Sequence, residues 1–588
     1  MVNIEVENER KLELKSLGDL LRRSCQQYRD KPALLVPEKD TFRTVTYKEL
    51  WEWVKRYASG LRALGLRRGD RICILSENSA HWAVLDWACQ VLGIIVAPIY
   101  PTLPPEQVAY IVENSEAKFV FCGDMQQLAK VAANQNVQAR LLTGSTKENQ
   151  PSSFEVVANE APPFPEDEFN RQIDEANGDD IATFIYTSGT TGLPKGVMLC
   201  HKSFIWMNEA VSAHLPLTHE DTFFTVLPLS HVFGRANDHF LPISLGATIG
   251  YCRSVASLGS DMLKVQPTVV LVVPRLLDAV KERIENNIKT QKPLNQILYS
   301  SFMRQGKKKA RGQFAPLYSP LYALVGIKIK NKLSPRLRFM VSGGAALPRD
   351  LFDFFFSIGI PIQQGYGLTE TTSGIYVNNP NHENCPDTVG EPLIGVETKI
   401  DEDGEILFRG PFVMKGYYKL PEETSAAIDK DGWFHTGDIG ELEGTRLRIT
   451  DRKKDLIVLG NGKNVAPQMI EGRLKEESLI VEAVVLGDGE DSCFALILPN
   501  YDRIREELQS KESDQALAKS LEAKKLVKAA VQKVNKSLAG YEAVKRFALL
   551  EEKFSIEAGE LTPTLKVKRK VITEKYAGLI SNLLSGHI

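Results

Sequence analysis

A loop of glycine, hydroxyl and lysine residues stands out in this chain: Tyr186-Thr187-Ser188-Gly189-Thr190-Thr191-Gly192-Leu193-Pro194-Lys195-Gly196. The apolar run 181–186 leads directly into the loop and predicts a buried strand. Glycines let backbone N–H groups approach an anion closely, while the hydroxyl groups and Lys195 add donors and positive charge. The Gly-x4-Gly-Lys-Ser/Thr spacing of a Walker A loop is absent. A flexible turn is the plain alternative, but the preceding strand favours a phosphate-binding site.

The residues before this loop alternate between helix and strand patterns. Apolar residues spaced by three or four predict an amphipathic helix over 47–64, ended by Gly65. Residues 71–75 and 94–97 predict short strands, and the second is apolar on both faces and ended by Pro98. The proline-rich, acidic stretch 144–180 predicts an irregular connection between two α/β units. The alternation predicts a layered α/β domain.

The segment 281–338 differs from its surroundings, because lysines and arginines interleave there with aromatic and aliphatic residues. Lys307, Lys308 and Lys309 are consecutive. The pattern predicts a helical insertion with a basic amphipathic face. Such a face is either a solvated helical hairpin or a surface that rests on an anionic membrane, where each basic residue contributes about 1 kcal/mol.

The residues from about 451 onward predict a separate, small α/β unit. Residues 480–486 and 494–498 have strand patterns, and long charged helices are expected between 503 and 537.

The composition is that of an ordinary globular chain. Of 588 residues, 43% are hydrophobic and 25% are charged, which excludes a mainly disordered or collagen-like protein. The length suggests about four domain-sized units. Lys plus Arg is 72 and Asp plus Glu is 74, so nothing global indicates a nucleic-acid partner. The eight cysteines form no C-x-x-C pair, no secretory signal pattern is visible, and the apolar windows 87–100 and 314–327 are too short to span a membrane. We therefore expect a cytoplasmic protein, with peripheral contact at the inner face of a membrane left open.

Further motifs follow the loop in a fixed order. Together they resemble the adenylate-forming enzymes, which include acyl-CoA synthetases, luciferases and peptide-synthetase adenylation domains, and the resemblance covers nearly the whole chain. It implies an α/β fold with a large N-terminal domain, residues 1–450, of two fused α/β subdomains and a smaller β-rich one. Residues 451–588 would form a small, mobile α+β lid. The motifs are Leu227-Pro228-Leu229-Ser230-His231, Gly343-Gly344-Ala345, Gln364-Gly365-Tyr366-Gly367-Leu368-Thr369-Glu370-Thr371, Trp433-Phe434-His435-Thr436-Gly437-Asp438, Asp451-Arg452-Lys453-Lys454-Asp455 and Thr562-Pro563-Thr564-Leu565-Lys566.

The resemblance implies a nucleotide site. The loop and Lys195 would hold the β- and γ-phosphates of ATP, and Tyr366 would stack on adenine. Asp438 would accept hydrogen bonds from the ribose hydroxyls, with Arg452 nearby, although a turn residue is the plain reading of Asp438 alone. The implied ATP- and AMP-binding residues are Thr187, Ser188, Gly189, Thr190, Thr191, Gly192, Lys195, Gly343, Gly344, Ala345, Gln364, Gly365, Tyr366, Gly367, Asp438 and Arg452.

The resemblance also implies four catalytic residues. Glu370 would hold Mg²⁺, Thr369 would contact the α-phosphate, and His231 would line the acyl site unless it is an ordinary core histidine. Lys566 would bridge the acyl carboxylate and the α-phosphate. Leu565 stands where the family often has glycine, so Lys568 is the alternative register.

Four more residues are implied for the second half of the reaction. Lys454 matches the hinge, where a few backbone dihedrals absorb a rotation of the lid. Gly460 and Gly462 would lie at the channel for the pantetheine arm of CoA, and Phe233 would line a tunnel for an alkyl chain.

The implied reaction joins a carboxylate to the α-phosphate of ATP, releases pyrophosphate, and then transfers the acyl group from AMP to the thiol of CoA. The insertion and the segment 228–235 resemble long-chain fatty acyl-CoA synthetases most. The expected partners are therefore a fatty acid, ATP with Mg²⁺, and CoA, and a homodimer is left open. An acyl carrier protein as acceptor, a luciferase-like oxidation and a non-catalytic nucleotide- or lipid-binding scaffold are the alternatives. A peptide-synthetase module is disfavoured, because no Gly-Gly-x-Ser carrier motif follows.

Overall fold

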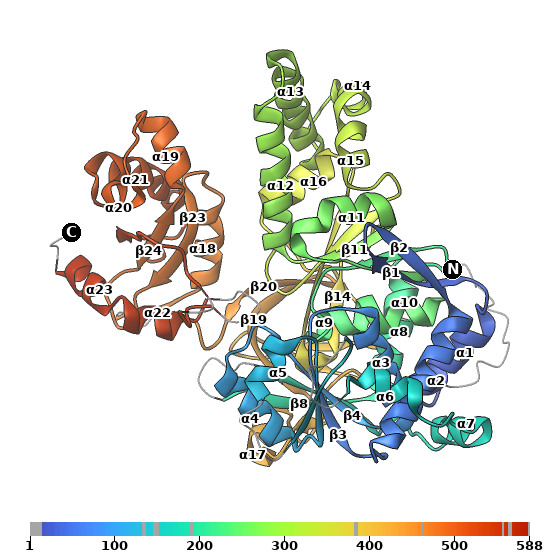
Figure 1. Cartoon of the computed structure of the whole chain (residues 1–588). Helices are drawn as coiled ribbons and strands as arrows, with labels where there is room; N and C mark the ends of the chain where they lie inside the picture. The colour runs from blue at the N-terminus through green and yellow to red at the C-terminus, as the bar shows by residue number, and fades with distance from the viewer. Residues whose placement is uncertain are drawn as a thin grey trace, which may run out of the picture.

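The computed structural model describes residues 14–131, 137–144, 152–187, 193–380, 386–460, 463–555, 558–561 and 567–585. Figure 1 shows a large body built around two sheets and a smaller unit at the C-terminal end. The order of elements confirms an α/β fold with a large N-terminal and a small C-terminal part.

The first sheet carries the end of the glycine-rich loop. Its strands run in the order β18-β8-β7-β4-β3-β5-β6, and β7 and β8 are antiparallel neighbours on either side of that loop. Helix α2 (Tyr47–Ala63) packs over this half and ends at Gly65 in the left-handed region, as predicted. The strands are β3 (Arg71–Leu75), β4 (Ile95–Ile99), β5 (Phe119–Cys122), β6 (Gln138–Leu141), β7 (Ile181–Thr187), β8 (Lys195–Cys200) and β18 (Gly416–Tyr417).

Two predictions for this half are wrong. Strand β4 runs through Pro98 to Ile99 instead of ending there, because β3 pairs with it as far as Ile99, while β7 on its other side pairs with it at Val96, before the proline. The stretch 144–180 includes α6 (Phe154–Glu160) and α7 (Glu166–Asp174), and it joins strands of one sheet instead of two units. Phe154 and Phe169 are fully buried, so these short helices contribute to the core, while the three prolines fall between them.

The second sheet has nine strands in the order β15-β14-β13-β12-β11-β9-β10-β1-β2. Its centre is parallel and its strands are buried on both faces, as a sheet covered by helices requires. The strands are β1 (Pro32–Glu38), β2 (Thr41–Thr46), β9 (Thr222–Thr225), β10 (Thr248–Tyr251), β11 (Val269–Val272), β12 (Phe339–Ser342), β13 (Ile362–Leu368), β14 (Ser373–Val377) and β15 (Glu391–Pro392).

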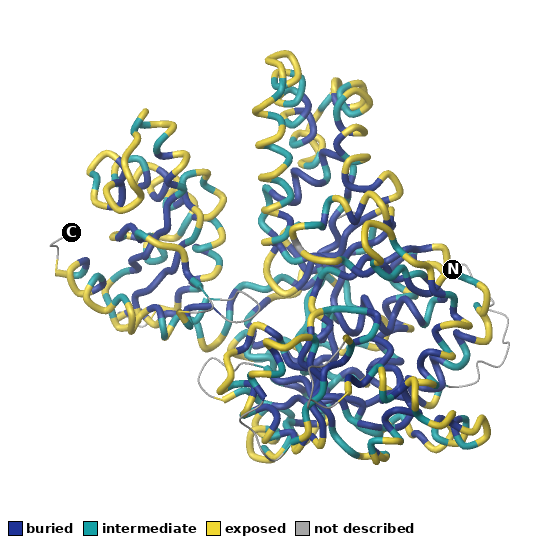
Figure 2. Tube along the Cα trace, in the orientation of Figure 1, coloured by how far each residue is buried: buried dark blue, intermediate teal, exposed yellow. Residues whose placement is uncertain are grey.

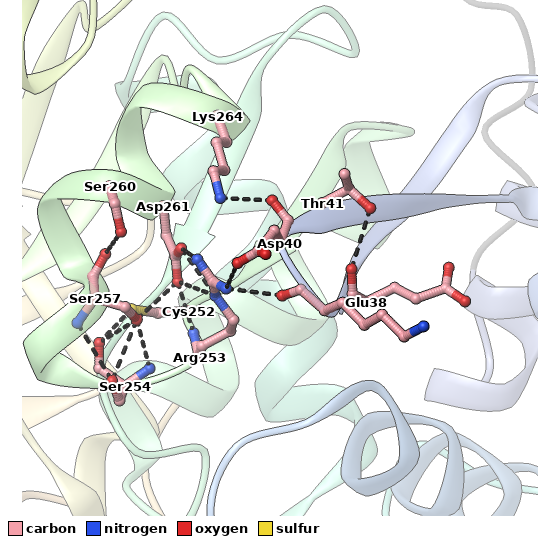
Figure 3. Close-up of polar contacts among 11 residues, drawn as sticks. Glu38, Asp40, Thr41, Cys252, Arg253, Ser254, Ser257, Ser260, Asp261 and Lys264 are labelled. Carbon is pink, nitrogen blue, oxygen red and sulfur yellow. Dashed lines mark hydrogen bonds and ion pairs between the residues drawn. The ribbon is translucent and has the colours of Figure 1, made fainter.

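The free edge of this sheet, the β1–β2 hairpin, is tied to α11 (Leu258–Val265). Figure 3 shows Arg253 between the hairpin turn and Asp261: Nη1 donates to the carbonyl of Lys39 at 2.8 Å and Nε donates to Asp261 Oδ1 at 3.0 Å. Lys264 Nζ donates to the carbonyl of Asp40 at 2.5 Å. These bonds occupy carbonyls at an edge that is otherwise open for pairing with another strand.

The C-terminal unit has a hydrophobic core of its own, formed among the described residues between Ile457 and Leu583. Before it, a small antiparallel sheet of β16 (Glu397–Ile400), β17 (Glu405–Arg409), β19 (Phe434–Glu443) and β20 (Arg446–Arg452) completes the body. The predicted boundary at 450/451 falls within β20 and stays a prediction. The unit comprises α18 (Pro467–Lys475), β23 (Ile480–Leu486), β24 (Phe494–Pro499), α19 (Tyr501–Leu508), α20 (Asp514–Lys519), α21 (Leu521–Asn535), β25 (Arg546–Leu549), α22 (Arg569–Lys575) and α23 (Ala577–Leu584).

The basic segment forms helices, as predicted. They are α12 (Pro274–Lys289), α13 (Pro293–Ala310), α14 (Tyr318–Leu321), the π-helix η3 (Tyr322–Gly326) and α15 (Ile327–Leu333). Figures 1 and 2 show them projecting from the body with exposed tips. None of the helices in the described residues is both long and apolar enough to cross a membrane.

Candidate active site in the central cleft

A cleft of about 3310 Å³ runs between the two sheets, the small antiparallel sheet and the C-terminal unit. It brings together predicted residues that lie far apart in the sequence. Ser188 to Gly192, Gly462 and Lys566 lie outside the described residues, and Gly460 is not part of the lining. The predicted residues that line the cleft are Thr187, Lys195, His231, Phe233, Gly343, Gly344, Ala345, Gln364, Gly365, Tyr366, Gly367, Thr369, Glu370, Asp438, Arg452 and Lys454.

Asp438 is the centre of one cluster in the cleft. It lies on β19 opposite Arg452 on β20, and the strand register brings Arg452 Nε to 3.0 Å from Asp438 Oδ1. The hydroxyl of Tyr366, at the end of β13, donates to Asp438 Oδ2 at 2.5 Å. Burial and then the charge of Asp438 raise the pKa of Tyr366 well above its ordinary value. The tyrosine is therefore neutral and keeps its proton for this bond.

A second cluster surrounds Lys195, the first residue of β8. Its Nζ forms an ion pair with Glu423 of α17 (Pro421–Ala427) and lies 5.0 Å from the ring centroid of Tyr417. The Tyr417 hydroxyl donates to Glu370 Oε1 at 2.9 Å. Burial and the Glu370 carboxylate raise the pKa of Tyr417 above its ordinary value. Tyr417 thus connects Lys195, the expected phosphate ligand, with Glu370, the expected metal ligand.

The predicted glycines stand where the chain passes itself closely. A Cβ on Gly367 would lie 1.9 Å from the carbonyl oxygen of Ser373, and one on Gly343 would lie 3.1 Å from the ring of Phe233. The side chain of Gln364 is a structural tie: its Oε1 accepts from the backbone N–H of Leu347 at 2.8 Å, and its Nε2 donates to the carbonyl of Thr388 at 3.2 Å. These contacts hold the 343–347 loop against β13.

His231 caps the short helix α9 (Val232–Gly234), because its Nδ1 accepts from the backbone N–H of Phe233 at 3.1 Å. Nδ1 therefore carries no proton, and the proton of the neutral ring is on Nε2. Phe233, next to it, lines the cleft and packs against a hydrophobic core cluster, several of whose buried members also line the cleft; we call this apolar lining the apolar arm. The apolar residues of that arm include Val211, Leu215, Phe223, Leu241, Leu271 and Val341.

The predicted hinge residue Lys454 and the predicted channel residue Gly460 follow β20, where the chain enters the C-terminal unit. Lys454 is exposed just after β20, while the preceding Lys453 bonds Glu405 Oε2 at 2.9 Å. Gly460 is exposed, and its N–H donates to the carbonyl of Glu490 at 2.8 Å. Lys568, the alternative to Lys566, lines the cleft at the start of α22.

Two residues of these clusters, Tyr417 and Glu423, were not predicted from the sequence. Tyr417 reaches the site because β18 pairs with β8, and Glu423 because α17 begins just beyond. The only local signal is Pro421 followed by two glutamates, which indicates the start of a helix and carries no information on its neighbour.

Comparison with known proteins agrees with this geometry. The model of the AMP-binding enzyme family matches residues 21–418, and that of the AMP-binding enzyme C-terminal domain matches residues 454–587. The chain therefore belongs to the AMP-binding enzyme family. The sequence-based recognition of an adenylate-forming enzyme is confirmed.

Several similar curated proteins are named as long-chain fatty acid–CoA ligases or long chain acyl-CoA synthetases, and this chain matches most of their length. The long-chain-fatty-acid–CoA ligase FadD15 of Mycobacterium bovis is 33% identical over 572 residues, which cover 93% of this chain and 94% of the relative. The peroxisomal long chain acyl-CoA synthetase 6 of Arabidopsis thaliana is 32% identical, covering 92% of this chain and 82% of the relative. Among solved structures, O-succinylbenzoate coenzyme A synthetase from Bacillus subtilis in complex with AMP has a TM-score of 0.70 at 23% identity, covering 94% of this chain and 97% of that chain, so it shares the fold.

Proposed function

We propose that this protein is an AMP-forming long-chain fatty acid–CoA ligase. The observation that carries the proposal is a single cleft that combines the Lys195–Tyr417–Glu370 cluster, the Tyr366–Asp438–Arg452 cluster and an apolar arm beside Phe233. The first cluster suits a triphosphate, the second suits a nucleoside, and the apolar arm suits an alkyl chain. The curated relatives, named as long-chain acyl-CoA ligases and synthetases, support the same substrate class.

In the first step, a carboxylate oxygen of the fatty acid attacks the α-phosphorus of ATP, and the bond to pyrophosphate breaks. Two anions must approach each other, so cations and preorganised donors lower the barrier. Lys195 and the loop residues Thr187 to Gly192 hold the β- and γ-phosphates, and Thr369 contacts the α-phosphate. Lys566 bridges the two reacting groups.

The nucleoside lies against the other cluster. Asp438, held by Tyr366 and Arg452, accepts hydrogen bonds from the ribose hydroxyls. The ring of Tyr366 supports adenine, and residues 343–345 and 364–367 form the remaining wall.

Glu370 suits a magnesium ion, because its carboxylate faces the Lys195 side of the cleft and Mg²⁺ is usually held by one or two carboxylates together with substrate phosphates. The described residues contain no group of three or more metal-ligating side chains, which fits an ion shared with the nucleotide. Bound there, Mg²⁺ would neutralise phosphate charge.

In the second step, the thiol of CoA attacks the acyl carbonyl carbon, loses its proton, and AMP leaves with the bonding electrons. Rotation of the C-terminal unit about Lys454 exchanges Lys566 for Gly460 and Gly462 at the reacting centre. Relatives named as CoA ligases favour CoA over an acyl carrier protein as the acceptor. The assembled site argues against a non-catalytic scaffold.

The direct test is fatty-acid-dependent exchange of labelled pyrophosphate into ATP. The proposal expects exchange with palmitate, and loss of at least a hundredfold in Glu370→Ala and Lys566→Ala. The Lys566→Ala enzyme should still convert supplied palmitoyl-AMP and CoA to palmitoyl-CoA. Absence of exchange with any fatty acid, or equal loss of both half-reactions in Lys566→Ala, contradicts it.

We also infer that the helices α12 to α15 rest on an anionic membrane that supplies the fatty acid. Their surface exposes large apolar side chains: Leu294 is 66% exposed, Ile297 63%, Phe314 86% and Leu317 56%. Leu294 and Ile297 lie near the start of α13, whereas Phe314 and Leu317 follow its last turn, which carries Lys307, Lys308 and Lys309. Exposed apolar side chains that follow a run of lysines suit the headgroup boundary of an anionic bilayer.

Vesicle sedimentation tests this contact. Replacing Lys307, Lys308 and Lys309 by Gln should weaken binding to phosphatidylglycerol vesicles about tenfold or more, and Phe314→Ser should weaken it further. Replacing Lys525 and Lys528 of α21 together with Lys536, the residue that follows this helix, is the matched control. Equal binding of both triple variants favours a solvated helical hairpin.

A further inference from the structure

Lys195, the cation expected to hold the β- and γ-phosphates, already has a carboxylate partner. Its Nζ pairs with Glu423 Oε2, a residue 228 positions away in the sequence. The two side chains keep 30% and 51% of their surface exposed, and both line the cleft. A triphosphate entering the cleft therefore meets a lysine whose charge is compensated.

The chain on both sides fixes Glu423 in front of Lys195. The backbone N–H of Tyr417 donates to Thr424 Oγ1 at 2.9 Å, and that hydroxyl donates to the carbonyl of Leu420 at 2.8 Å. A Cβ on Gly416 would lie 2.6 Å from Thr424 Cγ2, so helix α17 packs closely on β18. Because β18 is hydrogen-bonded to β8, the strand that Lys195 begins, the first turn of α17 is anchored to the strand of its partner.

Glu423 also lies near the Tyr417–Glu370 pair and is influenced by the charge of Lys454. Tyr417, whose ring centroid is 5.0 Å from Lys195 Nζ, donates its hydroxyl to Glu370. The hydrogen bond and charge of Lys195 lower the pKa of Glu423, and the charge of Lys454 at the expected hinge adds to this effect. The carboxylate is therefore ionised at neutral pH, within electrostatic reach of both the phosphate cation and the hinge.

We propose that Glu423 is a positioning residue that holds Lys195 until ATP binds, and that Lys195 exchanges this carboxylate for triphosphate oxygens as ATP enters. The proposal rests on the proposed function, since it takes Lys195 as a phosphate ligand. A half-exposed ion pair is weak, so a triphosphate with several negative charges displaces it. The reverse exchange returns Lys195 to Glu423 when pyrophosphate leaves. Glu423 thus favours product release at the expense of ATP affinity.

The test compares Glu423→Gln with Glu422→Gln, a neighbouring exposed glutamate on the same helix turn, in the full-length enzyme. Glu423→Gln should lower the Kd for ATP, measured by titration calorimetry without fatty acid, about two- to fivefold. The KM for ATP and the inhibition constant for pyrophosphate should fall by similar factors, and kcat should not rise. Glu422→Gln should leave these constants within about 1.5-fold of the parent values, because an exposed surface charge is screened by solvent and salt.

The same substitution in a Lys195→Ala background separates an exchange of Lys195 between partners from a direct repulsion of ATP by Glu423. In that background, Glu423→Gln should no longer change the Kd for ATP. An equal gain in both backgrounds means that Glu423 repels the triphosphate directly, which overturns the exchange. If Lys195→Ala weakens ATP binding but Glu423→Gln leaves the Kd for ATP unchanged in the parent enzyme, the exchange is overturned while the proposed function stands. If Lys195→Ala leaves the Kd unchanged, the phosphate role of Lys195 in the proposed function fails.

Discussion

Asp438 is a buried carboxylate in the wall of the cleft, and two neighbouring side chains hold it in place. It is 3% exposed, accepts from Tyr366 at 2.5 Å and pairs with Arg452 at 3.0 Å. A buried carboxylate is stable only with such partners, and here they also fix its orientation toward the cleft. The same residue therefore contributes to stability and, in our proposal, to ribose binding.

Replacing Asp438 by Asn should raise the KM for ATP at least tenfold and lower the free energy of unfolding by about 1–3 kcal/mol, because Arg452, whose side chain is 34% exposed, loses its buried charged partner. Steady-state kinetics and urea unfolding measure the two effects. The control is Glu441→Gln on the same strand, whose side chain is 63% exposed. An unchanged KM for Asp438→Asn would remove Asp438 from the nucleotide site.

Asp451, at the end of β20, gives stability a pH dependence. Burial raises its pKa to about 6, whereas in an unfolded chain the carboxyl titrates near about 3.9. Between about pH 4 and 6 the unfolded chain releases this proton while the folded chain retains it, so the free energy of unfolding falls as pH rises through that window. Relative to the parent, Asp451→Asn should gain about 2 kcal/mol between pH 4.5 and 6.5 in urea unfolding. A pH-independent difference refutes the raised pKa.

At the residue scale, the sequence predicted which side chains line the cleft, but it did not predict how they pair. The glycines, Lys195, Glu370, Asp438 and Arg452 were identifiable because their residue types and order carry the signal. The pairing of Lys195 with Glu423 depends on β18 adding to β8, which no local pattern encodes.

At the element scale, a buried ionic network joins helix α3 (Ala80–Leu92) to the π-helix η1 (Arg235–Phe240). Arg235 donates from Nε to Asp86 Oδ2 at 2.9 Å and from Nη1 to Thr183 Oγ1 at 2.6 Å, and His239 Nε2 lies 3.1 Å from Asp86 Oδ2. Burial opposes ionisation of Asp86, but Arg235 and His239 hold its pKa below the ordinary value. This network fixes the element that follows His231 and Phe233.

Removing one partner of the buried Asp86–Arg235 pair should destabilise the fold strongly. Asp86→Asn should lower the free energy of unfolding by about 3–5 kcal/mol, because it leaves the Arg235 charge buried without compensation. The matched control is Asp174→Asn, which breaks an ion pair to Arg22 whose Asp174 side chain is 58% exposed and should cost about 0–1 kcal/mol. Equal costs in calorimetric unfolding are incompatible with a fully desolvated Asp86–Arg235 pair.

Long amphipathic helices and compact apolar strands were predictable, whereas the shortest helices were not. The periodic apolar pattern located α2, and compact apolar runs located β3, β7 and β23. Helices α6 and α7 have only seven and nine residues, too few turns for a period to appear. The π-helices depend on tertiary packing and left no sequence signal.

At the scale of the whole molecule, two units with separate cores meet at the cleft, and the chain passes between them just after β20. Motif order predicted this division, while the position of the boundary and the movement of the lid stay predictions. A rotation needs a segment whose dihedrals can change without disturbing either core, and the exposed Lys454 lies in such a segment.

Lys454→Pro should therefore leave pyrophosphate exchange within about threefold of the parent and reduce acyl transfer to CoA at least a hundredfold, because proline fixes φ at the hinge. The two half-reactions are measured separately, the second from supplied acyl-AMP. Lys454→Ala, which keeps the backbone free, is the control. An unchanged transfer rate in the proline variant would place the hinge elsewhere.

The most direct measurement of the central claim is product analysis of the purified enzyme with ATP, Mg²⁺, CoA and a series of acids from acetate through octanoate to palmitate and oleate. The account predicts equal amounts of AMP, pyrophosphate and acyl-CoA, with kcat/KM rising toward the long-chain acids. Release of ADP and phosphate, or a preference for acetate over palmitate, would contradict it.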